Sequence, residues 1–307
     1  MWGVLGCSLL GSVTHASEPV VLYQGTAHDA LYDLCLAGQN GVAVGSDGLI
    51  LQSIDAGESW EAQEPFTSVA LLGVSCSTTP RLVVAQQGRI FRWDGQGYKP
   101  IASGTEARLL GVDANVNGLA FVVGGFGTVL RSTDGGKHWE TLSFDWEAIL
   151  NDFLEPHLYD VHISAQGVVT IVGEFELVLR SLDGGDTWNT VHKGEASLFG
   201  LYLQTDGGGF AVGQDGRVIR TRDGGANWAV VPTPTNAILL NVWSSPGGDV
   251  LVSGMRAALQ STDSGRSWNQ IGGRGISTGW YQGLSASPDT SVLLAGFRAS
   301  IIKLPLK

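Results

Sequence analysis

Short apolar runs separated by glycine, aspartate and serine fill the chain from residue 31 onwards. The runs are rich in Val, Leu and Ile, and none keeps the period of an amphipathic helix, so they predict short strands joined by tight turns. The runs occur in repeated units, and every unit contains three of them. In the first unit the second run is Gly41–Gly45 and the third run is Leu49–Ser53. The seven units begin at Leu31, Leu71, Leu109, Leu158, Leu198, Leu239 and Tyr281.

The third run of most units leads into a recurring turn of the pattern S/T-x-D-x-G-x-x-W, here called the Asp turn. Its Asp accepts hydrogen bonds from backbone N–H groups just beyond it, its Gly permits a positive φ, and its Trp opens a fourth strand and buries a large ring. We therefore expect these residues to be structural. The five complete copies contain Asp55 and Trp60, Asp134 and Trp139, Asp183 and Trp188, Asp223 and Trp228, and Asp263 and Trp268, and a degenerate copy covers Arg92–Tyr98.

Four strands in each of seven units predict an all-β fold, a seven-bladed β-propeller of four-stranded antiparallel blades. The seventh unit has no Asp turn and no fourth strand, whereas the apolar run Pro19–Gln24 has no unit of its own. We expect this N-terminal strand to complete the last blade, because closing the ring removes free sheet edges. Residues 18–307 then form a single domain.

The forty-residue rhythm of the units is broken once. Trp188, Trp228 and Trp268 lie forty residues apart, but 49 residues separate Trp139 from Trp188. The additional residues lie in an insertion over residues 144–157, between blades three and four, for which we expect a short helical turn over Glu147–Leu154. Insertions into regular repeats often carry function.

Composition and charge narrow the possible partners. The 307 residues include 44 glycines and carry a formal net charge of −11, which argues against a nucleic-acid-binding protein, since such a protein needs a basic face. No Cys or His spacing typical of a metal site is present, and the Asp turn lacks the alternating oxygen ligands and final Glu of a calcium-binding loop. We expect no metal and no cofactor.

The N-terminus predicts export. Trp2–Val13 is apolar and uncharged, and Thr14, His15 and Ala16 provide a small-residue cleavage site, which together indicate a signal peptide over residues 1–16. No Lys or Arg precedes the apolar run, so either the signal is atypical or the true start lies upstream. Two alternatives remain: a lipoprotein-type cleavage with a lipid anchor on Cys7, and an apolar N-terminal strand. The expected location is periplasmic or secreted.

Two further cysteines, Cys35 and Cys76, lie near the ends of the first strands of units one and two. In the alignment of the units they are offset by one residue, which directs side chains to opposite faces of a strand. This offset favours two small buried thiols over a disulfide.

The Asp turns resemble the Asp box, or BNR repeat, of sialidases and many other propellers. The longer pattern G-x-G-x-V-L-R-S-x-D-G-G-x-x-W, at Gly125–Trp139, is similar to the photosystem II stability/assembly factor family. This resemblance covers Glu18–Lys307. It implies a seven-bladed propeller without catalytic activity that helps to assemble a membrane complex, in the thylakoid lumen if the host is photosynthetic. Relatives in non-photosynthetic bacteria imply other clients.

The resemblance also implies a basic patch made by arginines at the ends of third strands. Arg92, Arg131, Arg180 and Arg220 occupy this position, but Gln52, Gln260 and Lys303 replace the arginine in blades one, six and seven. The alternative is that each arginine pairs locally with an Asp turn or covers the neighbouring blade.

Asp boxes also raise the possibility of a glycosidase. A sialidase requires three arginines around the substrate carboxylate, the first in an F-R-I-P motif near the start of the propeller, and this chain has no such motif. The nearest string, Ile90–Trp93, belongs to the third strand of blade two. Asp33 and Asp160, beside Tyr32 and Tyr159, recur in innermost strands and could line the channel, but nothing indicates a catalytic pair.

The candidate docking surface lies on the side of the ring opposite the Asp turns. We call it the turn face: it is formed by the turns between second and third strands and by the links between blades. Acidic residues mark it in blades one, four and five, two arginines mark blades six and seven, and apolar side chains stand at several turn tips, where a partner would cover them. The alternative is that these side chains pack on one another over the channel. The candidate docking residues are Asp47, Phe126, Trp146, Glu174, Phe175, Asp215, Met255, Arg256, Arg274, Trp280, Phe297 and Arg298.

These observations predict a monomeric, non-catalytic assembly or interaction factor with a protein client, such as a membrane-complex subunit or an envelope protein. A glycan-binding or glycan-hydrolysing propeller is the alternative.

Overall fold

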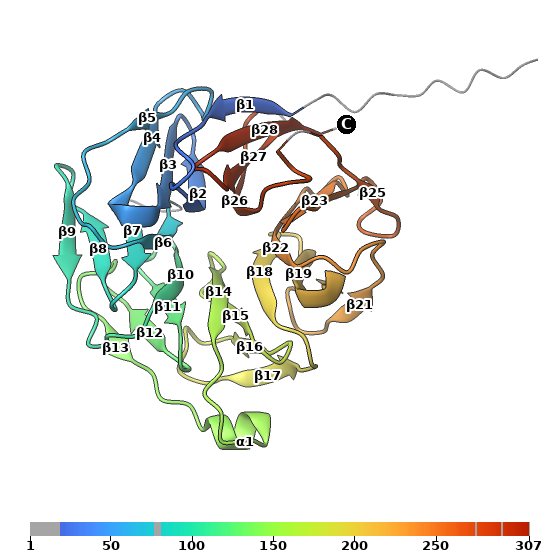
Figure 1. Cartoon of the computed structure of the whole chain (residues 1–307). Coiled ribbons are helices and arrows are strands. Elements are labelled where there is room, and N and C mark those ends of the chain that lie inside the picture. Colours follow the sequence, from blue (N-terminus) through green and yellow to red (C-terminus); the bar gives the residue numbers. More distant parts are fainter. Residues whose placement is uncertain (1–18, 77–80, 274, 290, 307) are drawn as a thin grey trace, which may run out of the picture.

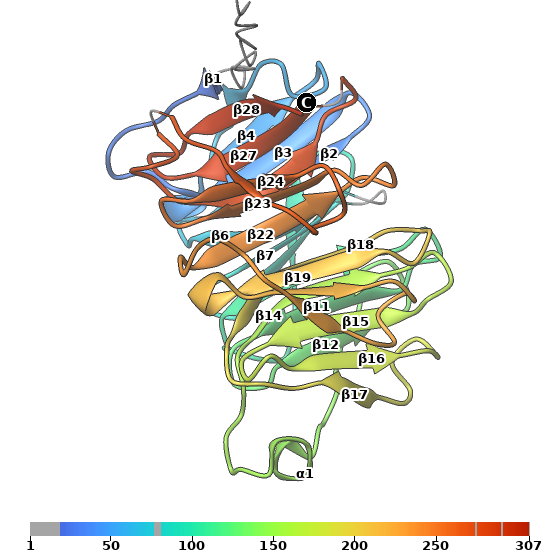
Figure 2. The same cartoon turned by 90° about the vertical axis from the view of Figure 1, so that its right-hand side faces the viewer.

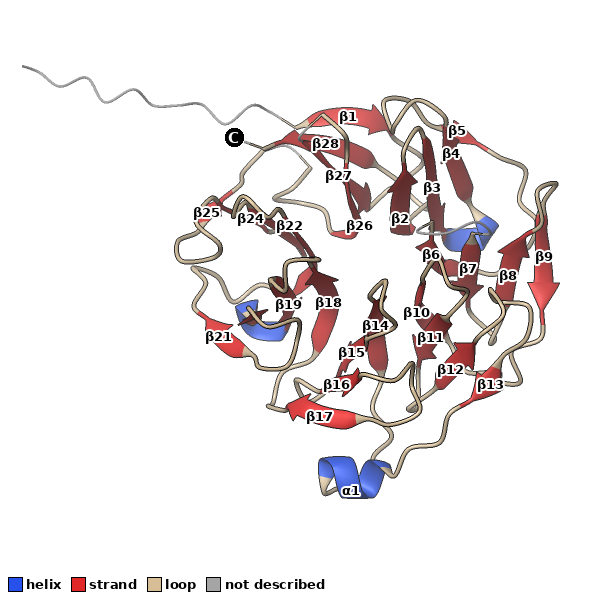
Figure 3. Cartoon of the chain, turned by 180° about the vertical axis from the view of Figure 1, so that it is seen from behind, coloured by secondary structure: helices blue, strands red, loops and turns tan. Residues whose placement is uncertain are grey.

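The strands form seven blades arranged in a ring around a central channel (Figure 1). The computed structural model describes residues 19–76, 81–273, 275–289 and 291–306. Within these ranges each blade is a four-stranded antiparallel sheet, which confirms the predicted seven-bladed β-propeller. Seen from the side the blades stack as tilted layers (Figure 2), and from behind the ring shows its strands joined by loops, with a short helix at its edge (Figure 3).

Each blade runs outwards from the channel in chain order. The innermost strands are β2 (Leu31–Ala37), β6 (Leu71–Ser75), β10 (Leu109–Ala114), β14 (Leu158–Ile163), β18 (Leu198–Leu203), β22 (Leu239–Ser244) and β26 (Tyr281–Ala286). The second strands are β3 (Asn40–Gly45), β7 (Leu82–Ala85), β11 (Ala120–Gly124), β15 (Val169–Gly173), β19 (Gly209–Gly213), β23 (Val250–Gly254) and β27 (Ser291–Gly296).

The two outer positions are shorter and more exposed. The third strands are β4 (Ile50–Ser53), β8 (Ile90–Trp93), β12 (Val129–Ser132), β16 (Val178–Ser181), β20 (Val218–Thr221), β24 (Ala258–Ser261) and β28 (Ile301–Pro305). The outermost strands are β5 (Glu61–Ala62), β9 (Tyr98–Ile101), β13 (Glu140–Thr141), β17 (Asn189–His192), β21 (Ala229–Val231), β25 (Asn269–Gln270) and β1 (Val20–Tyr23).

The ring closes through the two ends of the chain. Strand β1 pairs antiparallel with β28, with Val20 opposite Lys303 and Val21 opposite Ile302, so the N-terminal strand completes the last blade as predicted. Lys303 also forms ion pairs with Asp289 of its own blade, at 2.7 Å, and with Glu58 of blade one.

The core lies between the blades. The second strands are buried along almost their whole length, because both of their faces pack against neighbouring sheets. One apolar cluster, for example, joins Val212 and Val218 of blade five to Val242 and Val252 of blade six. Fully burying one such side chain stabilises the fold by about 1.5–3 kcal/mol.

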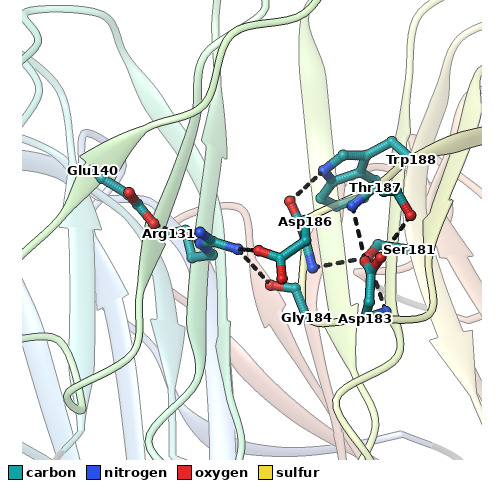
Figure 4. A network of polar contacts seen from close by, with 9 residues as sticks. Arg131, Glu140, Ser181, Asp183, Gly184, Asp186, Thr187 and Trp188 are labelled. Atoms are coloured by element: carbon teal, nitrogen blue, oxygen red, sulfur yellow. Dashed lines mark hydrogen bonds and ion pairs between the residues drawn. The ribbon is translucent and has the colours of Figure 1, made fainter.

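The Asp turns share one hydrogen-bond pattern, drawn for blade four in Figure 4. The Ser181 hydroxyl donates to Asp183 Oδ1 at 2.8 Å, and Asp183 also accepts the backbone N–H and the hydroxyl of Thr187. These donors lower the pKa of Asp183 to about 2. The pattern recurs at Asp55, Asp134, Asp223 and Asp263, whose carboxylates are likewise engaged in their own turns.

The third-strand arginines connect each blade to the next. Arg92 donates to the Gly135 carbonyl at 2.8 Å, and Arg180 donates to the Gly224 carbonyl at 3.1 Å. Both carbonyls belong to the fourth residue of the Asp turn in the following blade, and the equivalent bonds are Arg131 to Gly184 and Arg220 to Ser264. Arg131 also pairs with Glu140 and Asp186 (Figure 4). These contacts favour the local pairing of the arginines over a free basic patch.

A second set of contacts joins the innermost strands. Asp33 accepts the N–H of Leu34 in its own blade at 2.7 Å and the N–H of Val74 in the next blade at 2.8 Å. Asp160 does the same with Val161 and Leu201. Burial raises the pKa of Asp33 to about 7 and that of Asp160 to about 8, although these N–H donors act in the opposite direction. The two carboxyl groups therefore link neighbouring blades.

The prediction of two free thiols is wrong, because Cys35 and Cys76 form a disulfide with a Cα–Cα distance of 5.8 Å. The alternation rule applies along one strand, whereas β2 and β6 belong to neighbouring blades whose facing sides meet. Cys76 is buried in the cluster between blades one and two, and Cys35 packs against the same cluster.

The insertion contains a short helix, α1 (Trp146–Leu150), capped by Asp145, whose side chain accepts the N–H of Ala148 at 3.0 Å. The predicted helical turn is thus present but begins and ends earlier than expected. Helix α1 projects from the edge of the ring (Figures 1 and 2). No helix in the described ranges has the length needed to cross a membrane.

Breaking the Cys35–Cys76 bond should lower the free energy of unfolding by about 2–4 kcal/mol, since the bond closes a loop of 41 residues in the unfolded chain. Urea unfolding with and without reductant measures the difference, and the Cys35→Ser/Cys76→Ser variant should lose the sensitivity to reductant. Alkylation of both thiols in the native, non-reduced protein would contradict this assignment.

Replacing Arg180 by Ala should destabilise the protein by about 1–3 kcal/mol, because the half-buried Gly224 carbonyl loses a charged donor. Gln260 provides a matched control. It occupies the same position in blade six, where the following blade has no Asp turn, and its side-chain amide has no partner among the described residues. Gln260→Ala should therefore change chemical unfolding little, and equal losses from both variants would refute the role of the arginine.

Candidate functional site

The turns between second and third strands gather at one rim of the ring. In every blade the first residue of the turn donates its N–H to the carbonyl just before the innermost strand, as Ser46 does to Ala30 and Met255 to Ile238. Isolated bridges pair Met255 with Trp280 and Phe297 with Ala30, on the links that lead into the next blade. The predicted turn face is therefore one continuous surface of turns and links.

The second residue of all seven turns has a positive φ, including Phe126 at 55°, Phe175 at 62°, Arg256 at 56° and Arg298 at 58°. Gly, Asn and Asp tolerate this left-handed conformation, whereas Phe and Arg adopt it at a cost of about 1–2 kcal/mol per residue. The sequence thus keeps large side chains where small or polar residues would stabilise the turn better. Such strain points to a function for these side chains.

Several of these side chains are exposed and apolar. Phe126 is 67% exposed, Met255 45% and Phe297 37%. The alternative in which the tips pack on one another over the channel therefore does not describe these three residues. Phe175 is half-buried, and its carbonyl accepts the N–H of Gly194.

The innermost strands line the channel with a ring of bulge residues. In each strand the register with the second strand shifts between the first and third residues. The bulged second residues surround a cavity of about 290 Å³ together with Arg108: Tyr32, Leu72, Leu110, Tyr159, Phe199, Leu240 and Gln282. The sequence predicted Tyr32 and Tyr159 as channel-lining residues. The other residues around the cavity became evident only from the bulge that all seven innermost strands share.

An aromatic series connects the rim to this cavity. The ring of Phe126 meets His157 edge-on at 5.1 Å, His157 meets Tyr159 at 6.4 Å, and Tyr159 meets Phe199 at 4.7 Å. Glu174 positions the series, because its carboxylate accepts the N–H of His157 at 2.7 Å. Burial and the nearby Glu174 charge raise the pKa of Tyr159 to about 12, so this phenol stays neutral.

The charged candidates of blades five, six, seven and one are neighbours around the rim, with the two arginines between the two aspartates. Arg256 and Arg298 are exposed on blades six and seven, with the guanidinium of Arg298 lying 5.9 Å from the ring of Phe297. Asp47 and Asp215 are exposed at the tips of blades one and five. Trp280 stacks on Tyr32 at 5.9 Å, between the two arginines and the channel. The remaining candidate, Arg274, lies outside the described residues.

Trp146 packs inwards from helix α1. It stacks on Phe144 at 4.8 Å and lies over Gly127, where any Cβ would come within 2.2 Å of the indole nitrogen. The insertion exposes Phe153 at 85% and Leu154 at 49% instead. Both residues were expected within the predicted helical turn, and the sequence did not predict that they are exposed.

On the opposite side of the ring, an arginine cluster escaped the sequence analysis. Arg220, Arg222 and Arg266 line a cavity of about 240 Å³ between blades five and six. Burial and the charges of the other two arginines lower the pKa of Arg220, and none of the three forms an ion pair within the described ranges. Arg222 and Arg266 belong to the Asp turns of successive blades. The repeat alignment alone does not show that these two residues lie close together.

Among the described residues, no three His, Cys, Asp or Glu side chains are placed to hold a metal ion. The signal peptide and the lipid-anchor position Cys7 also fall outside the described residues.

Comparisons with known proteins agree on the fold. A structure of YCF48 bound to a D1 peptide superposes with a TM-score of 0.74 at 17% identity, covering 95% of this chain and 96% of that one. YCF48 from Cyanidioschyzon merolae gives a TM-score of 0.75 at 17% identity, with 94% and 99% covered. A catalytically inactive virginiamycin B lyase from Staphylococcus aureus with quinupristin gives 0.77 at 13% identity, with 94% and 99% covered.

Similarities of this kind show the fold alone, since a binding protein and a lyase score alike. A search of curated protein sequences finds no match. The model of the family described as photosynthesis system II assembly factor YCF48 matches residues 90–201, from the third strand of blade two to the innermost strand of blade five. The resemblance to the photosystem II assembly factor family that the repeats indicated is thus confirmed by the family model over residues 90–201, and the structural matches agree with the seven-bladed propeller fold.

Proposed function

We propose that this chain is a non-catalytic, extracytoplasmic interaction factor that binds an extended segment of a protein client on its turn face. The observation that carries the proposal is the set of large side chains held in left-handed turn positions around the channel mouth. A sequence selected for stability alone would place Gly, Asn or Asp there. The exposed Phe126, Met255 and Phe297 gain a hydrophobic contact only when a partner covers them.

The shape and the charges favour an extended peptide segment. The cavity of about 290 Å³ is large enough for one apolar side chain of the client, and the rim supplies aromatic anchors beside it. Arg256 and Arg298 lie on the neighbouring blades six and seven and are flanked by Asp215 on blade five and Asp47 on blade one, so this part of the rim offers both positive and negative charges to a client segment. A structurally similar YCF48 is bound to a D1 peptide, which supports a protein client.

Export is part of the same proposal. The Cys35–Cys76 disulfide is typical of oxidising compartments, such as the periplasm or the extracellular space. A client in a membrane complex or in the envelope is accessible from such a compartment. The carboxylates of the Asp turns are engaged in their own turns, so we do not propose a hydrolytic role for them.

Replacing Phe126, Arg256 and Arg298 by Asn should weaken client binding at least tenfold and leave thermal stability equal or slightly higher. Asn tolerates the left-handed conformation, so loss of binding cannot be ascribed to unfolding. The client segment is first located by cross-linking in the native host and then synthesised as a peptide, whose affinity is measured by fluorescence anisotropy.

The matched control for this triple variant is Arg222→Asn/Arg266→Asn, which removes equivalent charges from the opposite side of the ring. It should bind the peptide like the unchanged protein. If the control variant loses binding and the turn-face variant keeps it, the client binds the opposite side and the proposed docking face is incorrect.

Mass spectrometry of the mature protein from its host should find an N-terminus after Ala16. The apolar stretch before Ala16 and the small residues at the cleavage site carry this expectation. A diacylglycerol mass on Cys7 would instead support lipid anchoring, and an intact Met1 would contradict export by either route.

A further inference from the structure

The contact between successive blades is interrupted at two junctions, between blades one and two and between blades six and seven. From blade two to blade six a third-strand arginine donates to the Asp turn of the next blade, and Lys303 reaches Glu58 in the Asp turn of blade one. Between blades one and two neither partner is present. Gln52 replaces the arginine, and the degenerate turn of blade two is closed by Asp94, which accepts the N–H groups of Gln96 and Gly97 at 2.9 Å.

A cavity of about 320 Å³ opens at this junction, here called the junction pocket. Its size falls within the range of about 300–1,000 Å³ that is typical of small-molecule sites. It lies among the third and outermost strands of the two blades, away from the turn face. It is lined by Gln52, Gln63, Glu64, Phe66, Arg81, Trp93, Gln96 and Tyr98, with Val42, Ile50, Leu51 and Gly97.

Aromatic rings form one wall of the junction pocket. Phe66 stacks on Tyr98 with ring centres 4.7 Å apart, and Trp93 meets Tyr98 edge-on at 5.1 Å. The Arg81 guanidinium lies 5.8 Å from the centre of the Trp93 ring. These contacts hold the rings in place before any ligand arrives, which reduces the entropy lost on binding.

Polar groups form the other wall, and they are balanced in charge. The amides of Gln52, Gln63 and Gln96 each offer both a donor and an acceptor. Glu64 and Arg81 contribute one negative and one positive charge, so neither an anion nor a cation is favoured overall. The Tyr98 hydroxyl is buried beside the Arg81 guanidinium: burial raises the pKa of Tyr98, and the charge and hydrogen bonding of Arg81 oppose this rise.

We propose that the junction pocket binds a neutral saccharide unit of a glycan. A pyranose ring has an apolar face, which suits the aromatic rings of Trp93, Tyr98 and Phe66 that line the junction pocket, and a rim of hydroxyl groups that both donate and accept hydrogen bonds. The three amides match these hydroxyl groups. The inference is independent of the proposed function, because none of the candidate docking residues of the turn face lines the junction pocket.

The test is isothermal titration of the full chain with neutral oligosaccharides: cellohexaose, maltohexaose, xyloglucan oligomers and chitohexaose. We expect saturable binding of at least one of them. Trp93→Ala should weaken it at least tenfold, and Tyr98→Phe should weaken it about three- to tenfold, as for the loss of one hydrogen bond.

The Gln52→Arg variant distinguishes a loss of oligosaccharide binding from a loss of folding. It restores the guanidinium that occupies the corresponding position in four other blades, so it should fill the junction pocket and abolish binding while thermal unfolding is unchanged. The turn-face variant with Asn at positions 126, 256 and 298 should bind the oligosaccharide normally, which separates this proposal from client binding. Binding that survives both Gln52→Arg and Trp93→Ala, or no binding by any neutral oligosaccharide in the panel, would overturn the proposal.

Discussion

Every blade of this propeller depends on the closure of the ring. A single four-stranded sheet buries neither of its faces, and an open stack of seven would leave two apolar faces and two sheet edges in water. The pairing of β1 with β28 removes this cost by making the first and last segments of the chain part of one blade. The ion pair of Lys303 with Glu58 joins that composite blade to blade one, and Asp289 pairs with Lys303 inside the composite blade. Without this closure, the ring would open where the two ends of the chain meet, and the blades would separate from that point.

The connections between neighbouring blades follow one rule, and the departures from it are informative. An Asp turn presents its fourth carbonyl to the preceding blade, where a third-strand arginine donates to it. Gln260 occurs where the next blade has no Asp turn, and Gln52 occurs where the turn is degenerate. Residue choice at this strand position is thus determined by the neighbouring blade. Between blades one and two both partners of this contact are changed, and the junction pocket lies there.

The two sides of the ring serve different purposes. On the Asp-turn side, side chains are engaged in short-range hydrogen bonds that stabilise each outer hairpin. On the turn face, large residues adopt left-handed conformations that weaken the turns, and exposed rings surround a channel lined by bulge residues. In the proposed function, stability and recognition are therefore separated in space, so the turn tips can vary without disturbing the core.

The sequence by itself determined the number of blades, the order of strands, the closing strand and the structural role of the Asp turns, because these depend on local periodicity and on hydrogen bonds within a few residues. Helix α1 was predicted with shifted bounds, since its cap at Asp145 and its packing on Gly127 are set by the blade beneath it. The Cys35–Cys76 disulfide, the links made by Asp33 and Asp160, the arginine cluster between blades five and six, and the pocket beside Tyr98 were decided only by the tertiary structure. Each of these joins residues roughly forty positions apart on facing sides of two blades. The angle between blades sets which of these side chains meet, and no pattern within a single repeat contains that angle.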